Sequence, residues 1–230
     1  MPFIAYLIIF FSAMPLSAQA SDQSASKDKP LQVTNNWISD WESEGEEEGV
    51  KATCRMHVTN IKQCKFKTES DIPVAALSAV IMDVNRFKEW AVSVLSSDQI
   101  IYSETDTDVY VYTTYHFTGA YNRDAVSRYR KAEFPDEKRT KIDFISVDKP
   151  VEKKDLRLVR FPLMAGYWQF TEKENGKTEI ELLTFSLPGG LVQSTLHTLF
   201  NIGFIDASYE TMRVVQQQAS LPEYMAKAAK

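Results

Sequence analysis

A series of strand-like segments followed by one long apolar helical segment constrains the fold of this chain more than any other feature. The strands are expected at about 94–104, 108–118, 123–134, 139–148, 155–162, 166–173 and 177–187. Turn-forming sequences such as TDTD, PDEKR and ENGK mark connections between them, which favours antiparallel neighbours. The helix is expected over about 190–218, after Pro188-Gly189-Gly190, with an interruption or bend near Gly203. This order predicts an α+β fold, with helices on one face of an antiparallel sheet.

Alternation along these strands predicts which face of the sheet is covered. In DAVSRYRKAEF one face carries Ala125, Ser127 and Tyr129, and the other carries Val126, Arg128 and Arg130. The same pattern sets Ile142 and Phe144 against Asp143, and Ile180 and Leu182 against Glu179 and Glu181. Charged faces must meet water, so the apolar faces are expected to line the concave side. A curved sheet closed by one helix can enclose a cavity, but ordinary core packing has the same periodicity.

The first twenty residues, MPFIAYLIIFFSAMPLSAQA, are expected to direct export. Positions 3–13 are nearly all apolar, and Ala18-Gln19-Ala20 has the small-x-small form of a signal-peptidase site. The apolar stretch is shorter than the roughly 20 residues of a membrane span. We therefore expect a signal peptide at 1–20, a flexible leader at 21–30 and a periplasmic or secreted mature protein. The alternative is an uncleaved inner-membrane anchor.

The two cysteines are expected to form a disulfide. Cys54 and Cys64 flank VTN in VKATCRMHVTNIKQCKFKTE. If 58–60 form a three-residue hairpin loop, residue 57 pairs with 61, and 54 lies directly opposite 64, within bonding reach. The alternative is two separate buried thiols. A disulfide would fit an oxidising compartment.

The remaining elements are expected before the strand series. Residues 31–43, with Trp37 and Trp41, have the pattern of a short amphipathic helix, and the acidic EGEEEG that follows is expected to be a solvated turn. A hairpin over about 50–69 comes next, and then a helix in DIPVAALSAVIMDVNRFKEW. One domain is expected over 31–222, with a tail at 223–230.

No catalytic or metal-binding motif is recognisable in the sequence. His57, His116 and His197 fall in no HExxH spacing, and no GxSxG, phosphate-binding or dinucleotide-binding motif is present. We therefore expect no enzymatic activity, no cofactor and no metal. The net charge of −5 argues against nucleic acid as a partner. A monomer is expected.

Several short motifs occur in an order that resembles the StAR-related lipid-transfer (START) domain family. They are Gly49-Val50 opening a strand, Asp83, Phe87 and Trp90 ending a helix, Arg123-Asp124 opening a strand, Arg160 before Gly166-x-Trp168, and Pro188-Gly189-Gly190 before the last helix. Together they extend from about Trp37 to Val215. The resemblance implies a helix-grip fold, in which a curved antiparallel sheet surrounds a long C-terminal helix and an internal apolar cavity.

The resemblance also implies a ligand and its binding residues. The ligand would be one lipid or other hydrophobic small molecule, with transient membrane contact during exchange. The candidate lining residues are Tyr115, Arg123, Ser127, Tyr129, Phe144, Trp168, Leu182, Leu199, Phe200, Gly203 and Phe204. The segment FPLMAG at 161–166 is expected to be an exposed apolar loop that touches the bilayer through Leu163 and Met164.

The sequence departs from the family pattern in two places. Gln193 and Ser194 stand near the position where many members have a proline after Pro-Gly-Gly. Tyr129 stands where some sterol carriers have a buried arginine, so sterol specificity is not implied. The rival interpretation is an aromatase/cyclase-type or hydrolase-type enzyme with the same fold. It would require acid–base side chains to converge inside the cavity, for example Tyr129, His116 and Arg123.

Overall fold

The structure is a computed structural model that describes residues 36–100, 108–116, 121–148, 151, 155–189 and 194–228. The expected signal peptide, the leader and Gly190 lie outside these residues.

The described strands form one ten-stranded sheet in the order β1-β2-β3-β10-β9-β7-β6-β5-β4, and β8 pairs with β6 off this path. Neighbours along the path are antiparallel, whereas β8 runs parallel to β6. The strand bounds are β1 Glu42–Glu47, β2 Val50–Met56, β3 Lys62–Ser70, β4 Val94–Ile100, β5 Asp108–Tyr115, β6 Arg123–Phe134, β7 Arg139–Ser146, β8 Val159–Arg160, β9 Leu163–Glu172 and β10 Thr178–Leu187.

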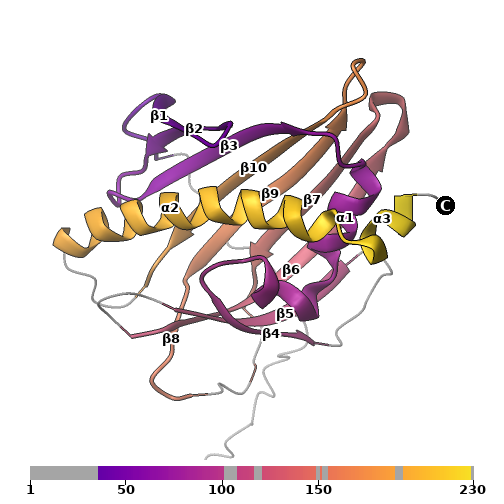
Figure 1. Cartoon of the computed structure of the whole chain (residues 1–230). Helices are drawn as coiled ribbons and strands as arrows, with labels where there is room; N and C mark the ends of the chain where they lie inside the picture. Colours follow the sequence, from indigo (N-terminus) through magenta and orange to yellow (C-terminus); the bar gives the residue numbers. More distant parts are fainter. Residues whose placement is uncertain are drawn as a thin grey trace, which may run out of the picture.

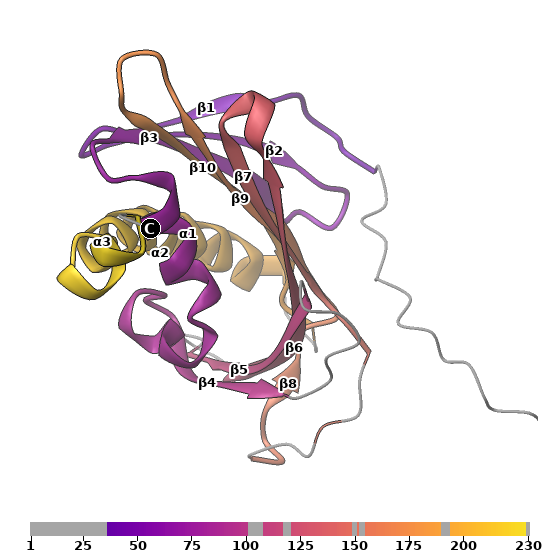
Figure 2. The same cartoon turned by 90° about the vertical axis from the view of Figure 1, so that its right-hand side faces the viewer.

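The sheet curves around one long helix, as the sequence predicts. The helical elements are α1 Val74–Met82, η1 Val84–Glu89, η2 Pro135–Glu137, α2 Ser194–Ala219 and α3 Pro222–Ala228. Helix α2 crosses the concave face of the sheet, and α1 and α3 lie together at its C-terminal end (Figures 1 and 2). The interruption expected near Gly203 is wrong, because α2 runs through this residue. A single glycine costs a helix only about 1 kcal/mol relative to alanine.

The C-terminal half of α2 is anchored in the core. Met212, Val215 and Ala219 are fully buried where α2 contacts α1. Helix α3 adds a buried tyrosine, Tyr224, whose hydroxyl donates to Asp83 Oδ2 at 2.9 Å. Residues 223–228 of the expected tail are therefore helical, and α3 contacts α1.

The N-terminal segment differs from the expectation. The described part of the segment expected as a helix, residues 36–43, is not helical: Trp37 forms a β-bridge with His57, and the Ile38 backbone amide donates to the Met56 carbonyl oxygen. The acidic run expected as a turn lies mostly in β1, an exposed edge strand, with its turn at 48–49. The spacing of apolar residues in this segment is helical, but its hydrogen bonds to the hairpin that contains β2 outweigh this local preference.

Three further predictions about the sheet are corrected: the length of one strand, the loop expected at 161–166 and the solvation of the convex face. The strand expected at 155–162 is reduced to β8, and 163–166 are part of β9 rather than a loop, with Leu163 and Met164 only 6% and 8% exposed. The convex face is also less solvated than expected. It carries a small apolar cluster around Val126, and Glu181 is buried beside Lys67, with 2.5 Å between Glu181 Oε2 and Lys67 Nζ.

The disulfide prediction is confirmed. Cys54 and Cys64 are directly paired across β2 and β3 and are joined by a disulfide, with their Cα atoms 4.1 Å apart. The hairpin loop also has the expected register, because the His57 amide donates to the Ile61 carbonyl oxygen.

Removing this disulfide should lower stability without changing the fold. The cross-link closes a short loop, with a sequence separation of 10. By restricting the unfolded chain, a loop of this length contributes about 2.5 kcal/mol to the free energy of unfolding. We expect a Cys54→Ala/Cys64→Ala variant to lose about that much free energy of unfolding in urea titrations. Reductant should destabilise the native protein equally and leave the double variant unchanged. Equal stability of the native protein with and without reductant would contradict this.

Candidate ligand-binding cavity

A cavity of about 510 Å³ lies between α2 and the concave face of the sheet. Its wall combines aromatic, aliphatic and hydroxyl side chains from η1, the sheet and α2. The lining residues are Phe87, Trp90, Ala91, Val92, Ser93, Val94, Tyr115, His116, Tyr129, Phe144, Phe161, Met164, Trp168, Leu182, Thr184, Ser186, Leu199, Phe200, Ile202, Gly203, Phe204, Ala207, Ser208 and Thr211. A volume of this size suits one small molecule, since ligand pockets typically measure about 300–1,000 Å³.

One end of the cavity is closed by aromatic rings. The Trp90 and Trp168 rings meet edge to face with their centroids 6.1 Å apart, and Phe87 contacts Trp90 in the same way at 4.7 Å. These three side chains are between 1% and 5% exposed. Such edge-to-face contacts hold ring orientations, so this end presents fixed aromatic rings, and the buried Trp90 Nε1 has no hydrogen-bond partner among the described residues.

The cavity also has an open end, which is rimmed by apolar residues. Val92, Leu199 and Ile202 line the cavity, yet they are 52%, 63% and 53% exposed. The N-terminal half of α2 that carries two of them is held to the β2–β3 hairpin by Asn201. The side-chain Nδ2 of Asn201 donates to the Asn60 carbonyl oxygen, and its Oδ1 accepts from the Lys62 backbone N–H, both at 3.0 Å.

Most of the residues predicted to line the cavity do so. The predicted residues that line it are Tyr115, Tyr129, Phe144, Trp168, Leu182, Leu199, Phe200, Gly203 and Phe204. Ser127 shares the concave side but is fully buried outside the lining. Arg123 is also outside the lining. The guanidinium of Arg123 donates to the carbonyl oxygens of Tyr121, Pro188 and Gly189, with 2.7 Å from Nε to Pro188.

Arg123 belongs instead to a junction where three of the sequence motifs meet. Next to it, Asp124 is fully buried and accepts two hydrogen bonds from Arg160, at 2.9 and 3.0 Å, and one from the Tyr112 hydroxyl. Gly189 has a φ of +65°, and an added Cβ would lie 2.7 Å from the Arg160 carbonyl oxygen. The junction therefore fixes the turn that leads into α2.

Two of the three acid–base residues named for the enzyme interpretation lie in the cavity wall. Tyr129 and His116 both line the cavity, but Arg123 does not. Burial raises the pKa of Tyr129, as does the nearby Tyr115 hydroxyl. Tyr129 therefore stays protonated near neutral pH and cannot readily serve as a base there.

The sequence reasoning missed the wall contributed by η1 and the segment after it. Phe87, Trp90 and the residues at 91–94 form one side of the cavity. The signal was present, because Phe87 and Trp90 belong to the family pattern at the end of the first helix. That pattern marks a position in the fold but does not tell which side chains face open space.

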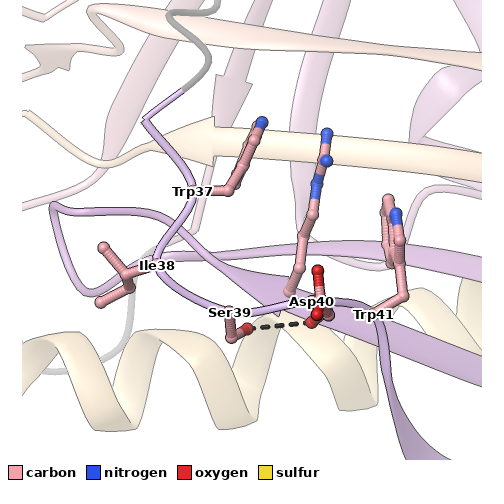
Figure 3. A pocket seen from close by; sticks show the side chains of 6 residues that line it. Trp37, Ile38, Ser39, Asp40 and Trp41 are labelled. Atoms are coloured by element: carbon pink, nitrogen blue, oxygen red, sulfur yellow. Dashed lines mark hydrogen bonds between the residues drawn. The ribbon is translucent and has the colours of Figure 1, made fainter.

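A second, open hollow lies on the N-terminal segment, away from the cavity lining. It is bounded by Trp37–Trp41 and Arg55 (Figure 3). The Arg55 guanidinium carbon lies 3.9 Å from the Trp37 ring centroid and 4.7 Å from that of Trp41. This stacking fastens the N-terminal segment to β2.

A curved antiparallel sheet that grips a long C-terminal helix around an internal cavity defines the helix-grip class of proteins. The START domain family matches residues 18–220, and the chain belongs to this family. None of the described helices is long and apolar enough to cross a membrane.

Solved structures of other proteins share this fold. A STAR-related lipid transfer protein fragment from Xanthomonas axonopodis is 19% identical, with a TM-score of 0.68 over 80% of this chain and 100% of that one. Human STARD10 is 17% identical, with a TM-score of 0.66 over 87% and 86%. The Zhui aromatase/cyclase from Streptomyces sp. R1128 is 13% identical, with a TM-score of 0.51 over 68% and 92%. A comparison with curated protein sequences finds no match.

Proposed function

We propose that this protein binds one hydrophobic ligand in the cavity and carries it across the aqueous space of a bacterial envelope. The observation that carries the proposal is the cavity itself, which lies between the sheet and α2 and is walled mostly by apolar side chains. Membership of the START family supports hydrophobic-ligand binding in general. Transport across the envelope is our extension.

The energetics favour a carrier. Burying fifteen methylene groups contributes roughly 12 kcal/mol before the costs of ordering the ligand and desolvating its polar end. A lipid with such a chain does not leave a membrane for water at a useful rate. An apolar cavity lowers this barrier without any covalent step.

The N-terminal sequence supports the envelope location. An export signal at 1–20 would place the mature chain in the periplasm or outside the cell, and the Cys54–Cys64 disulfide suits an oxidising compartment. The mass of the purified protein distinguishes cleavage after Ala20 from an uncleaved inner-membrane anchor.

Native mass spectrometry of protein purified from the envelope without detergent tests ligand binding directly. We expect one bound lipid per chain, which organic extraction then identifies. Protein that stays ligand-free after incubation with mixed lipid vesicles would contradict the proposal.

The open end of the cavity is the surface we propose for membrane contact, in place of the buried Leu163 and Met164. We expect Leu199→Asp/Ile202→Asp to weaken cosedimentation with phosphatidylcholine vesicles by more than about a hundredfold, because inserting each leucine or isoleucine contributes roughly 1.5–3 kcal/mol. Leu156→Asp is the matched control, since Leu156 is 92% exposed and does not line the cavity. Equal vesicle binding by all three proteins would contradict this assignment.

A further inference from the structure

The cavity wall is polar in places but carries no charge among its described residues. None of the lining residues is Lys, Arg, Asp or Glu. The buried charges nearest in sequence to Tyr129 are already bound elsewhere, because Arg123 faces backbone carbonyl oxygens and Asp124 faces Arg160. His116 is the one imidazole of the described wall, and it is exposed to solvent. A charged ligand group inside this cavity would therefore lose its hydration without gaining a counter-ion.

Uncharged polar residues line the cavity on several elements, and three of them lie close together on the sheet. Tyr129, Phe144, Gly166 and Thr184 are successive register partners across β6, β7, β9 and β10. Ser186 follows Thr184 on the same face of β10. No hydrogen bond among the described residues uses the hydroxyl of Tyr129, Thr184 or Ser186. These residues are 4–7% exposed and line the cavity, so a ligand in the cavity could supply their hydrogen-bond partners.

The neighbouring row of side chains is apolar. Trp168 pairs with Leu182 on β10 and with Ile142 on β7. Trp168 also contacts Trp90 at the closed end. The part of the wall formed by β6, β7, β9 and β10 thus changes along the strands from hydroxyl-bearing residues to apolar side chains, which sets a direction for a ligand with one polar end.

We infer that the ligand is an uncharged amphiphile whose hydrocarbon part faces Trp168 and Leu182 and whose hydroxyl or carbonyl group hydrogen-bonds to Tyr129. This inference rests on the proposed function and narrows its ligand class. It excludes carboxylates and phosphate-bearing headgroups from the interior of the cavity. Since Tyr129 stays protonated, its hydroxyl can both donate to and accept from the ligand.

Three twelve-carbon probes that differ at one end test the charge requirement at pH 8: dodecan-1-ol, dodecanoate and dodecane. Titration calorimetry with the full mature protein should show dodecan-1-ol binding on the order of 100-fold tighter than dodecanoate, because the carboxylate must be desolvated. Dodecane should bind more weakly than the alcohol, because it leaves the hydroxyls of the wall unpaired. Dodecyl lysophosphatidylcholine should bind no better than dodecanoate.

Tyr129→Phe tests the position of the polar end. We expect it to weaken dodecan-1-ol binding about three- to tenfold, the range for one neutral hydrogen bond, and to leave dodecane binding unchanged. Tyr121→Phe is the matched control, since Tyr121 is 67% exposed and does not line the cavity. Circular dichroism establishes that both variants are folded.

The outcomes separate this inference from the carrier function. If dodecanoate or the lysophospholipid binds as tightly as the alcohol, the uncharged class is wrong and the carrier function stands. If folded Tyr129→Phe binds the alcohol with native affinity, the role of Tyr129 is wrong. If none of the probes binds, the proposed function fails, and the inference fails with it.

Discussion

An Ala207→Trp variant should lose about a thousandfold in ligand affinity while remaining as stable as the native protein. Ala207 lines the cavity on α2, one helical turn from Gly203 and from Thr211, which line it as well. An indole at this position would occupy the space of about five methylene groups. At roughly 0.8 kcal/mol each, the ligand would lose about 4 kcal/mol of burial.

Stability should not fall, because the added side chain enters open space rather than a packed core. Filling a cavity commonly leaves stability unchanged or raises it by about 0.5–2 kcal/mol. Affinity is measured by calorimetry with the lipid identified by native mass spectrometry, and stability by urea titration of ligand-free protein. Gln217→Trp is the control, since Gln217 is an exposed residue of α2 outside the lining. Native affinity in folded Ala207→Trp would place the ligand elsewhere.

Much of the fold could be predicted from local pattern. Strand β6 has the bounds that its alternation predicts, and Tyr129 and Phe144 face the concave side as expected. The disulfide followed from the length of one hairpin loop. These predictions succeeded because period-two alternation and hairpin register depend on residues that are close in sequence or directly opposite.

Other features depend on partners that no local pattern records. The N-terminal segment pairs with β2 because an edge of the sheet is available there, although its own apolar spacing is helical. Arg123 binds backbone carbonyl oxygens of a turn 65 residues away, and backbone acceptors have no signature in the sequence. Periodicity also could not separate a filled core from a cavity, because both require the same inward apolar residues.

Arg160→Leu should be among the most destabilising substitutions, because it removes the charged partner of a fully buried carboxylate. Asp124 would keep the Tyr112 hydroxyl, at 3.0 Å, but would lose both hydrogen bonds from the Arg160 guanidinium. Removing one member of a buried ion pair typically costs about 3–5 kcal/mol. We expect a loss of this size in the free energy of unfolding, measured by urea titration.

Two further variants test whether the loss of stability comes from leaving the buried Asp124 carboxylate without its charged partner. Arg157→Leu makes the same change three residues earlier, where Arg157 and Asp155 are 80% and 41% exposed, and its effect should be within experimental error because water replaces the lost partner. Arg160→Leu combined with Asp124→Asn should recover part of the stability, since the amide oxygen still accepts from Tyr112 and no charge is buried, while the amide N–H groups are left without an acceptor. An equal loss in Arg157→Leu and Arg160→Leu would instead point to side-chain packing as the cause. Because the Arg160 carbonyl oxygen also lies against Gly189, the ion pair helps to fix the turn at which the chain leaves the sheet and enters α2. The buried pair thus stabilises both the sheet and the placement of the helix that closes the cavity.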